Sequence, residues 1–173
     1  MSNKDFLGYA ALFIALVLIQ VLICNHIALF NVAVPFLFIF FIIRLPLDLK
    51  TDWLLTLSFL LGFCVDLFSD TPGVNALACT LLAIVKRPVF FAYVPRDDKT
   101  AELTPTLSTM GWATYSKYLV TMSAIFSLLA FSIEYFNFAS VKDIIIMSAS
   151  STLLSFLLIV AADSLISTRR ERL

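Results

Sequence analysis

Apolar runs long enough to cross a lipid bilayer follow one another along most of this chain. A hydrocarbon core about 30 Å thick requires about 20 helical residues. The runs that we interpret as spans cover about residues 6–24, 31–45, 53–68, 74–93, 115–136 and 141–167. The pattern therefore predicts an all-α integral membrane protein, a six-transmembrane-helix bundle that forms one domain over residues 1–173.

The composition excludes several classes of protein. Hydrophobic residues make up 61% of the chain and charged residues 14%, with a mean hydropathy of +0.98. Soluble domains are nearer half apolar and about a quarter charged. The core of a water-soluble protein of this size could not bury the additional hydrophobic residues. The formal net charge is zero, which gives no indication of nucleic-acid binding. Three cysteines without a CxxC spacing and a single histidine are too few for a zinc site, so no metal or cofactor is expected.

The positive charges favour one orientation of the six spans. Eleven of the 12 Lys and Arg residues fall at the two termini or in the second and fourth connections, and only Lys142 falls on the other side. Because cytoplasmic loops carry the excess of Lys and Arg, we expect both termini in the cytoplasm. The fourth connection, about residues 86–114, contains prolines and mixed charges and is expected to be a cytoplasmic loop.

One acidic residue lies inside an otherwise apolar span. Asp66 follows the inner end of span 53–68 by about thirteen residues, or ~20 Å of helix, and Asp70 comes four residues later. A charge at this depth usually faces protein or water. Three roles stay open for Asp66: capping or pairing within the bundle, contact with a partner, and acid–base or ion-relay chemistry.

Small residues around this acid indicate close packing and a turn. Gly62 lies one turn before Asp66 and would permit the close approach of another backbone. Gly73 follows a proline and is expected to adopt a positive φ in the turn. Asn75 is expected to cap the start of the next span.

Two further spans carry small residues that indicate helix packing. Ala11 and Ala15 form a small-xxx-small pair in the first span. The last span has a weakly polar face made of Ser148, Ser151, Thr152 and Ser155.

The inner end of the last span carries charges of both signs. Asp163 lies one or two turns before Arg169 and Arg170, so we expect an interfacial salt bridge there. Nucleophile elbows, Walker loops, HExxH sequences and dinucleotide fingerprints are absent from the sequence, and we do not expect an enzyme.

Four stretches of the chain resemble the MreD family of bacterial rod shape-determining membrane proteins, in a Bacteroidetes-like form. They are residues 18–27, 34–38 and 62–76, and the pair 86–88 with 95–97. The most recognisable is Gly62-Phe-Cys-Val-Asp-Leu-Phe-Ser-Asp-Thr-Pro-Gly-Val-Asn-Ala76. The resemblance covers roughly residues 18–97. The second half of the chain agrees with the family in hydropathy and length only.

This resemblance implies a non-enzymatic scaffold in the bacterial inner membrane. Members of the family bind MreC and work with the MreB filament, the RodA polymerase and a class B penicillin-binding protein in cell elongation, peptidoglycan synthesis and cell shape. As a hypothesis, the residues that bind a partner or support the structure are Gly62, Asp66, Asp70, Gly73, Asn75, Ala11 and Ala15.

A second function stays open beside the scaffold. The MreD family resembles the substrate-binding subunits of energy-coupling-factor transporters, six-span bundles that use small-xxx-small alanines of the first span to contact their transporter partner; Ala11 and Ala15 match this pattern. Such a subunit would bind a vitamin-type small molecule. The polar residues available on the outer side are Gln20, Asn25, His26, Asp66, Asp70 and Asn75. A membrane transferase has only Asp66 and Asp70 in its support.

Overall fold

The fold is built from helices of unequal length. The computed structural model describes residues 3–24, 33–69, 71–95, 104–135 and 140–170. In chain order its helices are α1 (Asn3–Leu22), α2 (Ile39–Arg44), α3 (Thr51–Ser69), α4 (Val74–Tyr93), α5 (Leu107–Met110), α6 (Trp112–Glu134) and α7 (Val141–Arg170).

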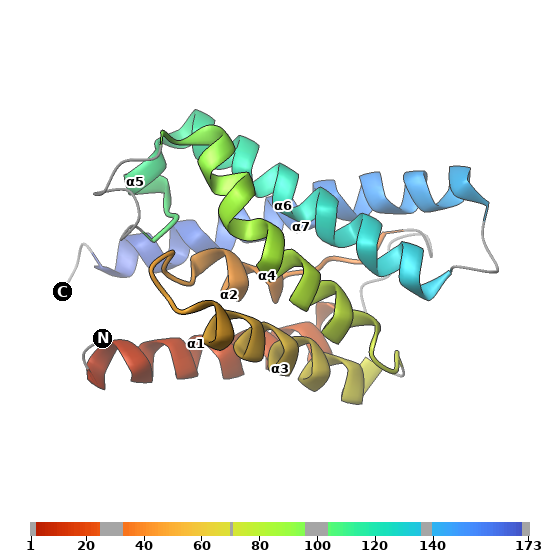
Figure 1. Ribbon diagram of the computed structural model, residues 1–173, viewed down its shortest axis with the longest axis horizontal. Coiled ribbons are helices and arrows are strands. Elements are labelled where there is room, and N and C mark those ends of the chain that lie inside the picture. Colours follow the sequence, from red (N-terminus) through yellow and green to blue (C-terminus); the bar gives the residue numbers. More distant parts are fainter. Residues whose placement is uncertain (1–2, 25–32, 70, 96–103, 136–139, 171–173) are drawn as a thin grey trace.

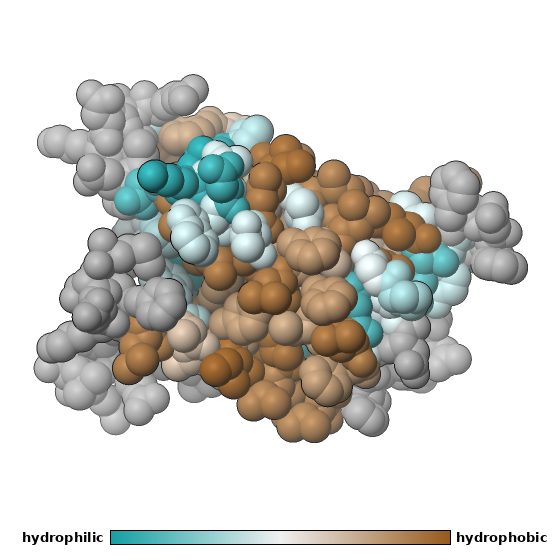
Figure 2. Space-filling view, turned by 60° about the horizontal axis from the view of Figure 1, so that its bottom comes forward, coloured by the Kyte–Doolittle hydropathy of each residue, from teal (hydrophilic) through white to brown (hydrophobic). Residues whose placement is uncertain are grey.

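The chain is a multi-pass membrane protein. Four helices are long and apolar enough to cross a bilayer: α3, α4, α6 and the part of α7 that spans Val141–Ser164. The apolar part of α1, Leu7–Leu22, is shorter. Figure 2 shows apolar side chains over the middle of one face and hydrophilic side chains toward its ends. Four of the six predicted spans therefore correspond to helices of membrane-crossing length.

The helices pack in a chain of neighbours. The most extensive contacts are those of α3 with α4, α4 with α6, and α6 with α7, while α1 lies along α3. In Figure 1, α2 lies in the middle of the bundle, and the start of α1 lies at the same end as the last turns of α7. This arrangement agrees with an even number of crossings; the cytoplasmic position of the termini stays a prediction.

The second predicted span differs from the expectation of one helix over residues 31–45. Among its described residues, 33–45, only Ile39–Arg44 is helical, and residues 34–37 before it are non-helical. Pro35 explains the break, because it has no N–H group and disfavours helical geometry in the residue before it. Most of residues 33–45 are buried inside the protein rather than lipid-facing, and Phe38 and Ile42 are among those with 0% exposure.

Side chains from two other helices satisfy the backbone of this non-helical segment. The Gln20 side chain of α1 donates from Nε2 to the Pro35 carbonyl (2.9 Å), and its Oε1 accepts from the Leu37 N–H (2.9 Å). From α7, Ser151 Oγ accepts from the Val34 N–H (3.0 Å), and Ser155 Oγ accepts from the Phe36 N–H (2.8 Å). Irregular backbone is tolerated at membrane depth only where protein or a cavity satisfies it. Ser151 and Ser155, which were predicted to pack against another helix, therefore also accept hydrogen bonds from the non-helical backbone.

The expected cytoplasmic loop over 86–114 begins later than predicted, because α4 continues to Tyr93. Lys86 and Arg87 consequently lie inside a helix. Lys86 is completely buried, and its Nζ donates to the Leu45 carbonyl. Part of the remaining connection, residues 104–111, forms the short helix α5 and the turn at Gly111.

Arg87 binds the connection between α2 and α3. Its Nε donates to the Leu47 carbonyl (3.2 Å) and its Nη2 to the Leu49 carbonyl (2.5 Å), while Nη1 donates to Thr51 Oγ1 (3.2 Å). Lys86 and Arg87 thus donate hydrogen bonds to carbonyl groups just after the end of α2, which no longer take part in helical hydrogen bonds.

The hydrogen bonds to the non-helical segment predict unequal effects for two serines of α7. Ser155→Ala leaves the buried Phe36 N–H without its acceptor, which should lower the free energy of unfolding by about 1–3 kcal/mol. Ser150→Ala is the control, because Ser150 bonds only to carbonyls of its own helix. Unfolding of the purified variants in one detergent checks this, and equal losses for both would contradict the assignment.

Candidate functional site

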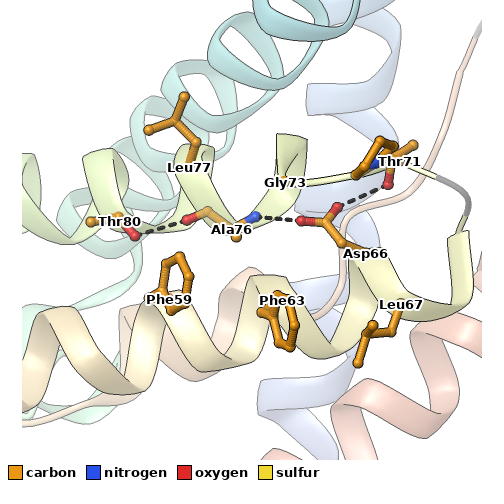
Figure 3. Close-up of a pocket in the computed structure, with 10 residues that line it drawn as sticks. Phe59, Phe63, Asp66, Leu67, Thr71, Gly73, Ala76, Leu77 and Thr80 are labelled. Carbon is orange, nitrogen blue, oxygen red and sulfur yellow. Dashed lines mark hydrogen bonds between the residues drawn. The ribbon is translucent and has the colours of Figure 1, made fainter.

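The corner between α3 and α4 is organised by one carboxylate. Asp66 Oδ1 accepts hydrogen bonds from the Asn75 N–H (3.0 Å) and the Asn75 side-chain amide (2.9 Å). Oδ1 also accepts from Thr71 Oγ1 (2.9 Å), and Oδ2 accepts from the Ala76 N–H (2.8 Å), as Figure 3 shows. The side chain comes from α3, yet it occupies the N-terminal end of α4. A helix N-terminus has unpaired N–H groups and a partial positive charge, so Asp66 caps α4.

Asn75 was expected to provide this cap and does not. The residue before α4 is Gly73, which has no side chain, and Asn75 is already inside the helix. Its amide donates both to Asp66 and to Thr71 Oγ1 (3.1 Å). The acceptor that the helix needs therefore comes from the preceding helix, and Asn75 helps to fix that acceptor.

The two glycines of the corner behave as the sequence predicts. Gly62 lies against the backbone of α4, where a Cβ atom would meet the Asn75 carbonyl oxygen at 2.3 Å and the Ala76 Cα at 2.6 Å. Gly73 has φ +84°, which L side chains rarely adopt. Both positions allow α3 to turn directly into α4 with the two helices in close contact.

The remaining described candidates, Ala11 and Ala15, do not join this corner. Asp70 lies outside the described residues. Ala11 and Ala15 are exposed on α1, so the small-xxx-small pair faces away from the bundle. The structure therefore brings together Gly62, Asp66, Gly73 and Asn75, and places the alanine pair on another surface.

An apolar groove opens beside the corner. Its volume is about 820 Å³. Phe59 and Phe63 lie on its α3 wall with stacked rings, 6.0 Å between centroids. Asp66 and Thr71 line one end, as Figure 3 shows. The full lining is Phe59, Phe63, Asp66, Leu67, Thr71, Pro72, Gly73, Ala76, Leu77 and Thr80.

A second cavity, about 340 Å³, lies where α1, the non-helical segment, α3, α4 and α6 meet. Of the predicted polar set, Gln20 and Asn75 line it, Asp66 is not among its lining residues, and Asn25, His26 and Asp70 lie outside the described residues. Its other polar side chains are Ser69, Thr71 and Glu134, and its aromatic ones are Phe36, Phe38, Phe68 and Phe131.

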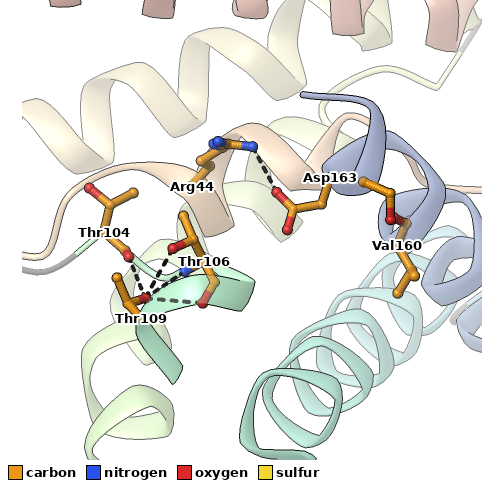
Figure 4. Close-up of polar contacts among 7 residues, drawn as sticks. Arg44, Thr104, Thr106, Thr109, Val160 and Asp163 are labelled. Carbon is orange, nitrogen blue, oxygen red and sulfur yellow. Dashed lines mark hydrogen bonds and ion pairs between the residues drawn. The ribbon is translucent and has the colours of Figure 1, made fainter. Parts of the chain in front are cut away.

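Asp163 forms a buried ion pair that differs from the predicted one. Its Oδ1 accepts from Arg44 Nη1 at 2.7 Å (Figure 4), and both side chains are at most 10% exposed. The side chains of Arg169 and Arg170 lie outside the described residues. Arg44 also lies over the Phe40 ring, 5.5 Å from its centroid. This pair joins the end of α2 to α7. The sequence signal that could have revealed it is the position of both charges toward the inner ends of predicted spans.

The four donors hold Asp66 as an acceptor at the N-terminal end of α4. Within the described ranges, no three His, Cys, Asp or Glu side chains are grouped as metal ligands.

Comparisons of this chain with protein-family models, with curated proteins and with solved structures found no match. A function is therefore inferred from the resemblance in the sequence and from the geometry of the corner, its groove and the second cavity.

The close approach at Gly62 predicts a large difference between two glycines. Gly62→Ala forces a Cβ atom against the α4 backbone and should destabilise the protein by at least ~1–3 kcal/mol, as overpacking does. Gly8→Ala is the control, since nothing lies within 4 Å of a Cβ atom there, and it should be neutral or stabilising by up to ~1 kcal/mol. Thermal unfolding in detergent compares them; a Gly62→Ala protein as stable as the parent would contradict the packing.

Proposed function

We propose that this chain is a non-enzymatic scaffold of the bacterial cell-elongation machinery, a member of the MreD family that binds MreC in the inner membrane. Two features support the proposal. The chain is a multi-pass helical membrane protein, and residues 62–76, which most closely resemble the family, form the α3–α4 corner.

The geometry of that corner is the observation that carries the proposal. The carboxylate of Asp66 accepts bonds from α4 and from the turn before it, which fixes the angle between two membrane-crossing helices. Outside this corner lie side chains that a soluble protein would bury, including Leu67, 64% exposed, and Phe59, 51% exposed. A rigid corner with an apolar outer face is suited to hold another protein within the bilayer rather than to transform a substrate.

In this proposal MreC is the direct partner. MreB, RodA and a class B penicillin-binding protein belong to the wider complex, with MreB on the cytoplasmic side.

A small-molecule binding function is the second candidate, and the second cavity favours it. Its polar and aromatic side chains converge on about 340 Å³, and binding pockets combine a mainly apolar lining with a few placed polar groups. The exposed Ala11 and Ala15 pair would serve as the contact with an energy-coupling-factor transporter. A shift in thermal unfolding with one member of a vitamin panel would favour this candidate over the scaffold.

The scaffold proposal predicts specific capture of MreC. The tagged full chain, co-expressed with the MreC of the same genome, should retain MreC through detergent purification. Deletion of the gene for this chain should turn rod-shaped cells round. The control is an unrelated single-span membrane protein expressed at the same level. MreC recovery no higher than that of the control, together with unchanged cell shape, would overturn the proposal.

A further inference from the structure

We propose that the α3–α4 groove holds one transmembrane helix of a partner protein, and that this helix is apolar except for a Lys or Arg placed at the level of Asp66. This inference rests on the proposed scaffold function, because it takes the partner to be a separate membrane protein. It adds the surface that the partner occupies and the chemistry by which that surface selects it.

The shape of the groove fits a helix. Phe59, Phe63 and Leu67 lie on its α3 wall, and each is between 43% and 64% exposed. Its α4 wall includes Leu77, 48% exposed, and the small, half-buried Thr80, and a small residue lets a second helix approach closely within a membrane. The Thr80 hydroxyl donates to the Ala76 carbonyl (2.8 Å), so this hydroxyl does not need a hydrogen-bond acceptor from the partner helix.

One end of the groove holds a carboxylate that pairs with no cationic side chain of the described residues. Asp66, 6% exposed, lines this end, and the only ion pair in the described part of the chain joins Arg44 to Asp163 instead. The partial positive charge at the N-terminus of α4 offsets only part of a full negative charge. The donors to Asp66 are backbone, amide and hydroxyl groups, which are all neutral. A carboxylate has about four acceptor sites. Oδ1 accepts three of the hydrogen bonds and Oδ2 accepts one, so Oδ2 keeps capacity for a further donor.

A cationic side chain is the complement that this end of the groove favours. The attraction between opposite charges strengthens as the effective dielectric falls, and ionisable residues within membranes usually pair with one another. A long Lys or Arg side chain on an apolar helix could reach Asp66 while its stem stays against Leu67 and Phe63. Lipid acyl chains would cover the apolar walls but would leave the carboxylate without a counter-charge.

Designed helices of known sequence test this directly. The full chain, fused to a fluorescent protein and placed in liposomes, is mixed with acceptor-labelled Leu–Ala helices that carry either one Arg six residues from one end or Leu at that position. We expect the Arg helix to associate at least about tenfold more tightly, the size of one added polar interaction of about 1.4 kcal/mol. Equal association of the two helices would overturn the inference.

Two matched variants locate the binding surface. Leu67→Trp fills the groove and should remove the association, whereas Leu153→Trp on α7 should not; the two leucines are equally exposed, at 64% and 63%. Asp66→Asn should remove the preference for Arg, provided that its thermal unfolding shows it folded. An unchanged Leu67→Trp protein would contradict the inference, and so would energy transfer between two labelled copies that Leu67→Trp abolishes, since a second copy would then be the occupant.

The failure of this inference can be told apart from that of the scaffold function. MreC capture that persists in the Leu67→Trp variant would leave the scaffold in place and move its contact to another surface. An Arg-selective groove in a chain that does not capture MreC would keep the groove and remove the proposed partner.

Discussion

Backbone groups that leave a helix inside a bilayer must find partners within the protein, because lipid offers none. Three interruptions in this chain meet that requirement with side chains. Asp66 accepts from the first N–H groups of α4, Gln20 together with two serines of α7 satisfies the segment before α2, and Lys86 and Arg87 donate to the carbonyls after it. Buried polar residues such as Gln20, Asp66, Lys86 and Ser155 are therefore placed where its helices break.

This constraint separates the inside of the protein from its functional surface. Because Asp66 holds α4 against α3, the corner keeps a fixed shape while most of the side chains that line its outer groove are apolar. The apolar side chains of Phe59, Phe63 and Leu67 are then left facing the membrane, available to a partner helix. In the account we propose, one carboxylate both fixes the corner and marks the level at which a cation of the partner would bind.

The sequence predicted the elements that depend on local pattern. The fourth span, 74–93, matches α4, and the roles of Gly62 and Gly73 followed from their positions beside a turn. The break before α2 was missed because apolar length outweighed Pro35, although the proline was a usable signal. The ion pair of Arg44 with Asp163 joins residues 119 positions apart, and no local pattern encodes such a contact. Likewise, Asp66 was recognised as a candidate, but its bonds to α4 depend on how two helices pack.

Amide hydrogen exchange of the full chain in lipid nanodiscs tests this account most directly. Val34, Phe36 and Leu37 should exchange as slowly as amides inside α4, although no helical hydrogen-bond ladder protects them. Asn75 and Ala76 should be protected at a helix end that would normally fray. Fast exchange at these five amides would show that the side chains do not hold the breaks closed, and would contradict the account.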